Sequence, residues 1–156
     1  MAETTPPCTV RYADHVGIAV RDLEAAMALF HDVFGVPRGE VTVLEDQGVK
    51  ATLLPLGQTR LELLEPLSPE SPVGRFIQRR GEGLHHLALN VDDIDGKLRA
   101  LADRGVELVD SSPREGLSGA IAFLHPRSTH GVLTELVETA GPQADSDADS
   151  DGRGGH

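Results

Sequence analysis

The sequence predicts an α+β fold in which two tandem βαβββ modules form an incomplete, eight-stranded barrel with pseudo-twofold symmetry. Three observations lead to this prediction. Two strand-like segments, residues 14–20 and 83–91, each place a histidine on one face with small residues and put apolar residues on the opposite face. A pattern typical of an amphipathic helix follows each segment. Each module then closes with a strand that mixes glutamates with apolar residues, at 62–65 and 135–138.

The two modules keep the same internal spacing. His15 and His86 are 71 residues apart (86 − 15), and Asp22 and Asp93, which follow the two strands, are separated by the same number (93 − 22). Two copies are too few for a solenoid. The spacing therefore predicts a duplicated module.

The first module is expected over about residues 10–66. Its first strand is expected at 10–20, and the helix after it begins at Asp22, whose side chain can cap the first turn. This helix carries an apolar stripe at helical spacing and ends at Gly35, a residue typical of helix C-termini. Three further strands are expected at 41–44, at 49–54 and around Glu62.

A joint over residues 67–83 connects the modules. Ser71 followed by Pro72 is typical of a helix start, with an N-cap and a proline at the first helical position. The short helix expected here is basic because it carries Arg75, Arg79 and Arg80.

The second module is expected over about residues 84–139 and repeats the order of the first. A strand ends near Val91 and a helix ends at Gly105. Three more strands are expected near 107–109, 120–124 and 132–137. The polar, glycine-containing loop at 111–119 is a candidate for the rim of an active site.

Charge and composition argue against one class of function. The formal net charge is −11, and aromatic residues make up only 3% of the chain. A nucleic-acid-binding surface needs a basic footprint and often uses aromatic side chains for stacking. We therefore expect no nucleic-acid partner. An anionic substrate would have to be held by a local cluster of basic groups or by a cation.

The chain has room for a single domain, which we expect over residues 10–140, with a flexible segment at 1–9 and a disordered acidic tail at 141–156. No apolar run approaches the length of a membrane span, so we expect no membrane partner. The first residues lack the basic and apolar regions of a secretory signal, and the single cysteine, Cys8, fits a reducing compartment. These features predict a cytoplasmic protein.

Four polar side chains occupy equivalent positions in the two modules: His15, Glu62, His86 and Glu135. Glu62 lies 47 residues after His15 (62 − 15), and Glu135 lies 49 residues after His86 (135 − 86). If the modules pair about a twofold axis, all four side chains can converge on one cleft. Two imidazoles and two carboxylates suit a divalent ion such as Co, Ni, Mn, Fe or Zn, and buried carboxylates without such a cation would be costly. The pattern therefore predicts a metal site inside the barrel.

The remaining histidines are expected to be structural. Simple alternation along the strand places His85 on the face opposite to His86. The others have no counterpart in the other module and are expected at the surface or in packing contacts: His31, His125, His130 and His156.

The repeated module with these ligands resembles the vicinal oxygen chelate superfamily, and residues 12–138 resemble the methylmalonyl-CoA epimerases within it. Segment 14–20 is generic to the superfamily, and segment 57–66 also matches. The more specific matches are Ser71-Pro72, Gly83-Leu84-His85-His86, and 123–126 together with 131–136.

The resemblance implies a cytoplasmic or organellar homodimer that binds an acyl-CoA and uses Co²⁺ or a similar divalent ion (Ni²⁺, Mn²⁺ or Zn²⁺). It implies His15, His86 and Glu135 as metal ligands, with the residue at Glu62 completing the set. The implied activity is the interconversion of (2R)- and (2S)-methylmalonyl-CoA.

The four residues fit this chemistry. The carbon between a thioester and a carboxylate is acidified by both groups, and a cation chelated by two substrate oxygens stabilises the enolate formed on deprotonation. A carboxylate on one face removes the proton, and an acid on the other face returns one with inverted configuration. Glu135 is expected to be one of these two groups.

The chain departs from the family pattern at the second group. Many epimerases carry another catalytic glutamate on the strand after a Gly-Val pair, where this chain has Ala51, and often have Gln at the position of Glu62. We therefore expect Glu62 to serve both as a ligand and as the second acid/base opposite Glu135. The alternative is that Glu62 is only a ligand and that water or another side chain protonates the second face.

Three other functions share this ligand set or fold. A glyoxalase I-like lactoylglutathione lyase also moves a proton beside a metal, but the specific motifs of the second module argue against it. An extradiol dioxygenase uses two histidines and one glutamate and would leave Glu62 unexplained. A non-catalytic ligand-binding protein of the same fold would need aromatic residues in its cleft rather than four metal-ligating side chains.

Overall fold

The computed structural model describes residues 5–139 of the chain. Eight strands form one mixed sheet in the order β2-β3-β4-β1-β5-β8-β7-β6. The strands are β1 (Tyr12–Ala19), β2 (Val41–Leu44), β3 (Val49–Leu56), β4 (Thr59–Pro66), β5 (Gly83–Asn90), β6 (Arg114–Glu115), β7 (Gly119–Leu124) and β8 (Thr134–Thr139). The predicted acidic tail at 141–156 and residues 1–4 of the predicted N-terminal segment lie outside the described residues.

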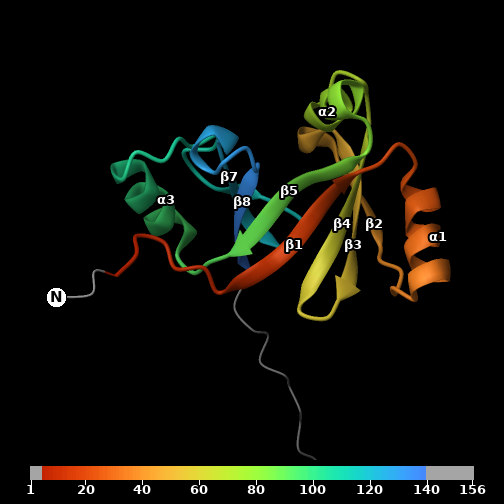
Figure 1. The fold of residues 1–156 in the computed structure, drawn as a ribbon, viewed down its shortest axis with the longest axis horizontal. Helices are drawn as coiled ribbons and strands as arrows, with labels where there is room; N and C mark the ends of the chain where they lie inside the picture. The colour runs from red at the N-terminus through yellow and green to blue at the C-terminus, as the bar shows by residue number, and fades with distance from the viewer. Residues whose placement is uncertain (1–4, 140–156) are drawn as a thin grey trace, which may run out of the picture.

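The strand order confirms the duplicated module and its pseudo-twofold symmetry. The first module contributes β2-β3-β4-β1, and the second contributes the same sequence of strands, β6-β7-β8-β5, from the other edge. β1 and β5 pair antiparallel where the modules meet, while β1 pairs parallel with β4 and β5 pairs parallel with β8. Figure 1 shows β1 and β5 side by side at the centre, with α1 and α3 at opposite ends of the molecule.

The helix after β1 begins where the sequence predicts it, and the helix after β5 begins at the equivalent position of the second module. α1 (Leu23–Phe34) is capped by Asp22, whose carboxylate accepts a hydrogen bond from the Ala25 amide at 3.0 Å, and it ends at Gly35 in a left-handed conformation. α3 (Ile94–Asp103) is capped in the same way by Asp93. None of the helices in residues 5–139 is both long and apolar enough to cross a membrane.

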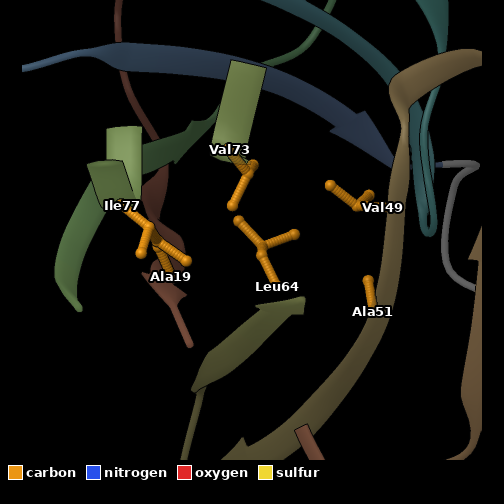
Figure 2. Close-up of a cluster of buried hydrophobic side chains, with 6 residues drawn as sticks. All are labelled: Ala19, Val49, Ala51, Leu64, Val73 and Ile77. Carbon is orange, nitrogen blue, oxygen red and sulfur yellow. The ribbon is translucent and has the colours of Figure 1, made fainter. Parts of the chain in front are cut away.

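A third helix, α2 (Pro72–Arg80), lies in the predicted joint between the modules. Its N-cap is Ser71, which accepts a hydrogen bond from the Gly74 amide at 3.1 Å, and Pro72 occupies the first turn. One face of α2 buries Val73 and Ile77 over strands of the first module. Figure 2 shows this apolar cluster, which contains Ala19, Val49, Ala51, Leu64, Val73 and Ile77. The cluster holds α2 in place and leaves its other face free.

The edge of the second module differs from the prediction. Residues 107–109 form only an isolated bridge, Leu108 to Leu124, because the amides of Val109 and Asp110 both donate to the carbonyl of Phe123 and a regular ladder cannot continue. The edge strand is instead β6, inside the segment predicted as a loop. The other strands differ from their predicted bounds by a few residues at their ends.

Candidate active site

Two buried histidines face each other where the modules meet. His15 on β1 and His86 on β5 have 2% and 5% of their surface exposed, and their Nε2 atoms are 3.1 Å apart. Gly17 pairs with His86 across the two strands, and a Cβ atom on Gly17 would overlap the His86 ring. The small residue beside the imidazole, noted in the sequence, is therefore required by the close approach of the ring.

The strand register brings the two glutamates to the histidines. Gly17 lies between Glu62 on β4 and His86 on β5, and Ala88 lies between His15 on β1 and Glu135 on β8. Both glutamates are buried. Each carboxylate contacts both imidazoles: the nearest atoms lie 3.4 and 3.8 Å away for Glu62 and 3.3 and 3.7 Å away for Glu135. The four predicted side chains thus meet inside the half-barrel.

This donor set fits a divalent metal ion. His15, His86 and Glu135 each offer one ligand atom, and these atoms lie within 4.8 Å of one another. Ligands at about 2.0–2.2 Å from one cation are separated from each other by roughly 3 Å, close to the contacts seen here. Two neutral imidazoles and two carboxylates would also balance the charge of a divalent ion. Glu62 is placed to complete the set.

Asp14, which the sequence analysis did not single out, contacts the Nδ1 atom of His15, on the side of the ring opposite to the Nε2 atom that faces the other site residues. The β1–β5 pairing shifts register between Ala13 and His15, so Asp14 occupies a β-bulge and its side chain turns inward. Its carboxylate contacts His15 Nδ1 at 2.8 Å and accepts hydrogen bonds from Arg60 at 2.5 Å and Asn90 at 3.0 Å. An aspartate directly before a candidate ligand histidine is the signal that could have predicted this contact.

The electrostatics of this pair follow from these contacts. Burial raises the pKa of Asp14, but the hydrogen bonds from His15, Asn90 and Arg60 outweigh it and lower the pKa to about 2. Burial lowers the pKa of His15, but the hydrogen bonds to Asp14 and Glu135 and the charge of Glu62 outweigh it and raise the pKa to about 10. Without a metal, His15 is therefore a cation at neutral pH.

The prediction that His85 points away from His86 is wrong. The β1–β5 pairing shifts register again after Gly17, which pairs with His86 while Ile18 pairs with Leu84, so His85 is the extra residue of a second bulge. Its Nδ1 lies 2.9 Å from His86 Nδ1, and its ring packs edge-on against Phe76. Burial lowers the pKa of His85 to about 4, so this neighbour of the second histidine is neutral.

Comparison with known proteins agrees with this geometry. Residues 14–123 match the Glyoxalase/Bleomycin resistance protein/Dioxygenase superfamily. The chain belongs to this superfamily. Its members share the eight-stranded half-barrel seen here, and the predicted vicinal oxygen chelate fold is therefore confirmed.

The relatives within this superfamily are mostly epimerases. Mouse mitochondrial methylmalonyl-CoA epimerase is 35% identical over 87% of this chain and 78% of its own length. The ethylmalonyl-CoA/methylmalonyl-CoA epimerase of Cereibacter sphaeroides is 36% identical over 80% of this chain and 96% of its own length. The uncharacterized protein YqjC of Bacillus subtilis is 41% identical, covering 83% of this chain and 94% of the relative.

Solved structures of methylmalonyl-CoA epimerases are similar to this chain in fold and in sequence. Methylmalonyl-CoA epimerase from Mycobacterium tuberculosis has a TM-score of 0.82 and 37% identity, covering 88% of this chain and 94% of the other. A variant of the Streptomyces coelicolor enzyme in complex with 2-nitronate-propionyl-CoA has a TM-score of 0.82 and 38% identity, covering 85% and 97%.

The superfamily site opens into a cavity of about 400 Å³. Three of the four predicted residues line it, namely Glu62, His86 and Glu135, together with His85 and Phe123. The predicted loop also reaches the cavity, through Arg114, whose guanidinium lies over the Phe123 ring at 5.6 Å. The opposite wall is formed by other residues of the first module, from Glu45 to Val49.

The cavity also clarifies the departure noted at Ala51. Ala51 is fully buried in the apolar cluster below α2, away from the cavity lining, so no carboxylate is missing from the wall at that position (Figure 2). Other carboxylates outside the predicted ligand set line the cavity: Glu45 and Asp46, in the short 3-10 helix η1 (Glu45–Gln47), and Glu70. The sequence analysis missed Glu45 because an acidic residue in a short connection carries no periodic signal.

Glu62 has the electrostatics of a group that can exchange protons. Burial raises its pKa to about 7; the charge of His15 lowers it and the charge of Glu135 raises it. A carboxyl group with a pKa near neutrality can act both as an acid and as a base at physiological pH. This holds for the metal-free site, since a bound cation would favour the ionised form.

Proposed function

We propose that this chain is a methylmalonyl-CoA epimerase that interconverts the (2R)- and (2S)-forms of its substrate by removing and returning the C2 proton. The observation that supports this proposal is the meeting of two histidines and two glutamates inside the half-barrel, where three of them line one cavity. Superfamily relatives with the same fold are methylmalonyl-CoA epimerases, and one solved neighbour is a complex with methylmalonyl-CoA.

The proposed cofactor is a divalent ion, most simply Co²⁺, with Ni²⁺, Mn²⁺ or Zn²⁺ as alternatives, held by His15, Glu62, His86 and Glu135. When bound, the cation would supply Lewis-acid stabilisation of the enolate that forms on loss of the C2 proton. Chelation should abolish turnover and added Co²⁺ should restore it. Full activity in a sample verified to be free of metal would contradict the proposal.

The chain's own residues move the proton. Glu135, buried beside both histidines, is the proposed acid/base for one face of C2. Glu62 is the proposed acid/base for the other face because it projects from the other module and lines the same cavity as Glu135. Glu45 is the second candidate, since it lines the same cavity and would be free of the metal.

Two substitutions decide between these glutamates. Gln retains a ligand oxygen but cannot exchange a proton at neutral pH, so the variants are Glu62→Gln and Glu45→Gln. In D₂O, the variant that has lost the second acid/base should still exchange deuterium into one C2 epimer and barely interconvert the two, with its metal content unchanged. Interconversion by Glu62→Gln at near the wild-type rate would reject the dual role of Glu62.

Proton NMR in D₂O also tests the substrate. Methylmalonyl-CoA should exchange its C2 proton in the presence of the enzyme. Turnover of a methylglyoxal–glutathione hemithioacetal in its place would identify a lactoylglutathione lyase, and binding of ligand without exchange would identify a non-catalytic binding protein. Ethylmalonyl-CoA belongs in the same assay because the Cereibacter relative is named for both substrates.

A cytoplasmic homodimer is the proposed state of the enzyme. The surface around the start of β5 supports a second copy, since Leu84 on β5 and Val132 in the loop before β8 are large apolar residues with 72% and 45% of their surface exposed. Together with Val16, Leu87 and Leu133 they line one hollow, which Arg80, His85 and His86 border. Light scattering should give twice the chain mass, and Leu84→Glu should reduce it to that of a monomer.

A further inference from the structure

A second cavity lies along the face of α2 that carries its arginines. Residues at helical spacing on α2 line it: Pro72, Arg75, Phe76, Arg79 and Arg80. The loop that leads into β8 forms the other wall, through Pro126, Gly131 and Leu133. The cavity measures about 390 Å³, and we call it the arginine groove.

The arginine groove continues from the active-site cavity. Pro72 and His85 line both spaces, so the start of α2 and the bulge before His86 form their common border. A ligand whose reacting end lies beside Glu62 and Glu135 can therefore extend past Pro72 along α2. In Figure 1, α2 lies at the end of the sheet where β5 begins.

The charge of the arginine groove is opposite to that of the protein. The chain carries a formal net charge of −11, yet three arginines and no carboxylate line this cavity. Arg75, Arg79 and Arg80 are exposed. In the described part of the chain none of them pairs with an acidic side chain: Arg75 donates to the Glu70 carbonyl, and Arg80 lies over the Phe76 ring. Guanidinium groups without acidic partners are suited to bind phosphate in bidentate geometry.

From these observations we propose that the arginine groove binds the phosphate groups at the nucleotide end of the acyl-CoA substrate, while the acyl end lies at the glutamates. This inference rests on the proposed function for the identity of the substrate. Phe76 and Ile77 hold α2 against the protein, so the arginines project from a fixed helix face and little ordering is needed when the phosphates bind.

The test compares two charge-neutralising double variants. Arg79→Gln/Arg80→Gln removes two charges from the groove, and Arg99→Gln/Arg104→Gln removes two exposed arginine charges from α3 and its C-cap. Each is assayed with methylmalonyl-CoA and with methylmalonyl-pantetheine, which lacks the nucleotide. The kcat/KM for methylmalonyl-CoA, divided by that for methylmalonyl-pantetheine, should fall by roughly tenfold or more in the groove variant. The same ratio should stay unchanged in the control variant.

Direct binding of CoA separates the two proposals. By calorimetry, the groove variant should bind CoA roughly tenfold or more weakly than the wild type, and added salt should weaken the wild type more than the variant. If the wild-type protein binds CoA more tightly than the groove variant but epimerises neither substrate, the proposed function is overturned and the proposal that the arginine groove binds phosphate still stands. A wild type that epimerises, with the substrate ratio and CoA affinity unchanged in the groove variant, overturns the groove. Equal losses on both substrates would assign the arginines a structural role and also overturn it.

Discussion

The two modules place their histidines alike and support them differently. In each, the residue just before the histidine occupies a β-bulge and contacts its Nδ1 atom, but that residue is Asp14 in the first module and His85 in the second. The first histidine is consequently a cation in the metal-free protein, with a pKa of about 10. Burial, reinforced by the positive charge of His15, lowers the pKa of His86 well below its ordinary value, so it is neutral.

This difference shows that symmetry of the backbone does not impose symmetry of charge. A metal ligand must present an unprotonated nitrogen. His86 meets this condition before metal arrives, whereas His15 must first lose a proton. Once deprotonated at Nε2, His15 donates its Nδ1 proton to a carboxylate, and His86 can donate its own only to a neutral imidazole. Asp14 and His85 are thus positioning residues of unequal strength.

Loss of either histidine should have the largest effect. His15→Ala and His86→Ala each remove a ligand on which the site depends, so metal content should fall from about one ion per chain to near zero, and epimerisation should fall by more than about a hundredfold. Elemental analysis and the NMR assay measure these. His31→Ala is a matched control because His31 lies on α1, and it should keep both metal and activity. A His86→Ala variant with full metal content would remove that residue from the ligand set.

Substitution of the residue that contacts each histidine's Nδ1 atom should have a larger effect on stability and metal affinity in the first module than in the second. Asp14→Asn leaves Arg60 and His15 without a buried carboxylate, so unfolding free energy should fall by about 2–4 kcal/mol and metal affinity by about ten- to a hundredfold. His85→Ala should keep the metal with a smaller loss of affinity, since it removes only a neutral acceptor. Denaturant titration and metal titration measure the two effects. Equal losses in both variants would show that the charge of Asp14 gives it no special role.

The small residues opposite the histidines offer a third comparison. Gly17→Ala puts a methyl group into the space of the His86 ring, and we expect a loss of about 1–3 kcal/mol in stability together with weaker metal binding. Ala88→Gly, at the matching place beside His15, removes a methyl and should cost only about 0.5–1 kcal/mol. Thermal denaturation with and without Co²⁺ tests this order, and a larger loss in Ala88→Gly would contradict it.

Protonation should give the smallest and most specific effect. The pKa of His15 rises from 6.5 to about 10 on folding, so the metal-free folded state binds the extra proton more tightly than the unfolded state does. Its contribution to stability is fully present below about pH 6.5 and is lost as pH rises toward 10. Denaturation of metal-free protein across this range should show the decline, and Asp14→Asn should flatten it. Metal binding near pH 8 should release a proton from His15, detectable in buffers of different ionisation enthalpy.

The sequence was sufficient for the fold and for the meeting of the four donors. Alternation along β1 and β5 and the equal offset of the modules are global patterns, and a pseudo-twofold axis leaves the buried polar positions only one place to converge. Local irregularities of the strands could not be predicted from the sequence. The bulges at Asp14 and His85 break the period of two, so simple alternation placed His85 on the wrong face.

The candidate second acid/base, Glu45, could not be predicted from the sequence for a similar reason. Ala51 lies on a regular strand and was easy to notice, but its inward position belongs to the apolar cluster below α2. Glu45 lies in a turn of 3-10 helix, where its direction depends on how η1 closes at Gly48. That closure is set by tertiary contacts, such as the packing of Gly48 against Ser71, which no pattern within the segment encodes.

Joining the two modules in one chain has a consequence for stereochemistry. In a dimer of identical modules, any change beside one histidine would appear beside both, and the centre would treat the two sides of a substrate alike. A tandem chain can vary Asp14 without varying His85, as this one does. The proposed substrate has a thioester on one side of C2 and a carboxylate on the other. A centre whose halves differ can tell these ends apart, and so hold C2 in one orientation while its two faces exchange the proton.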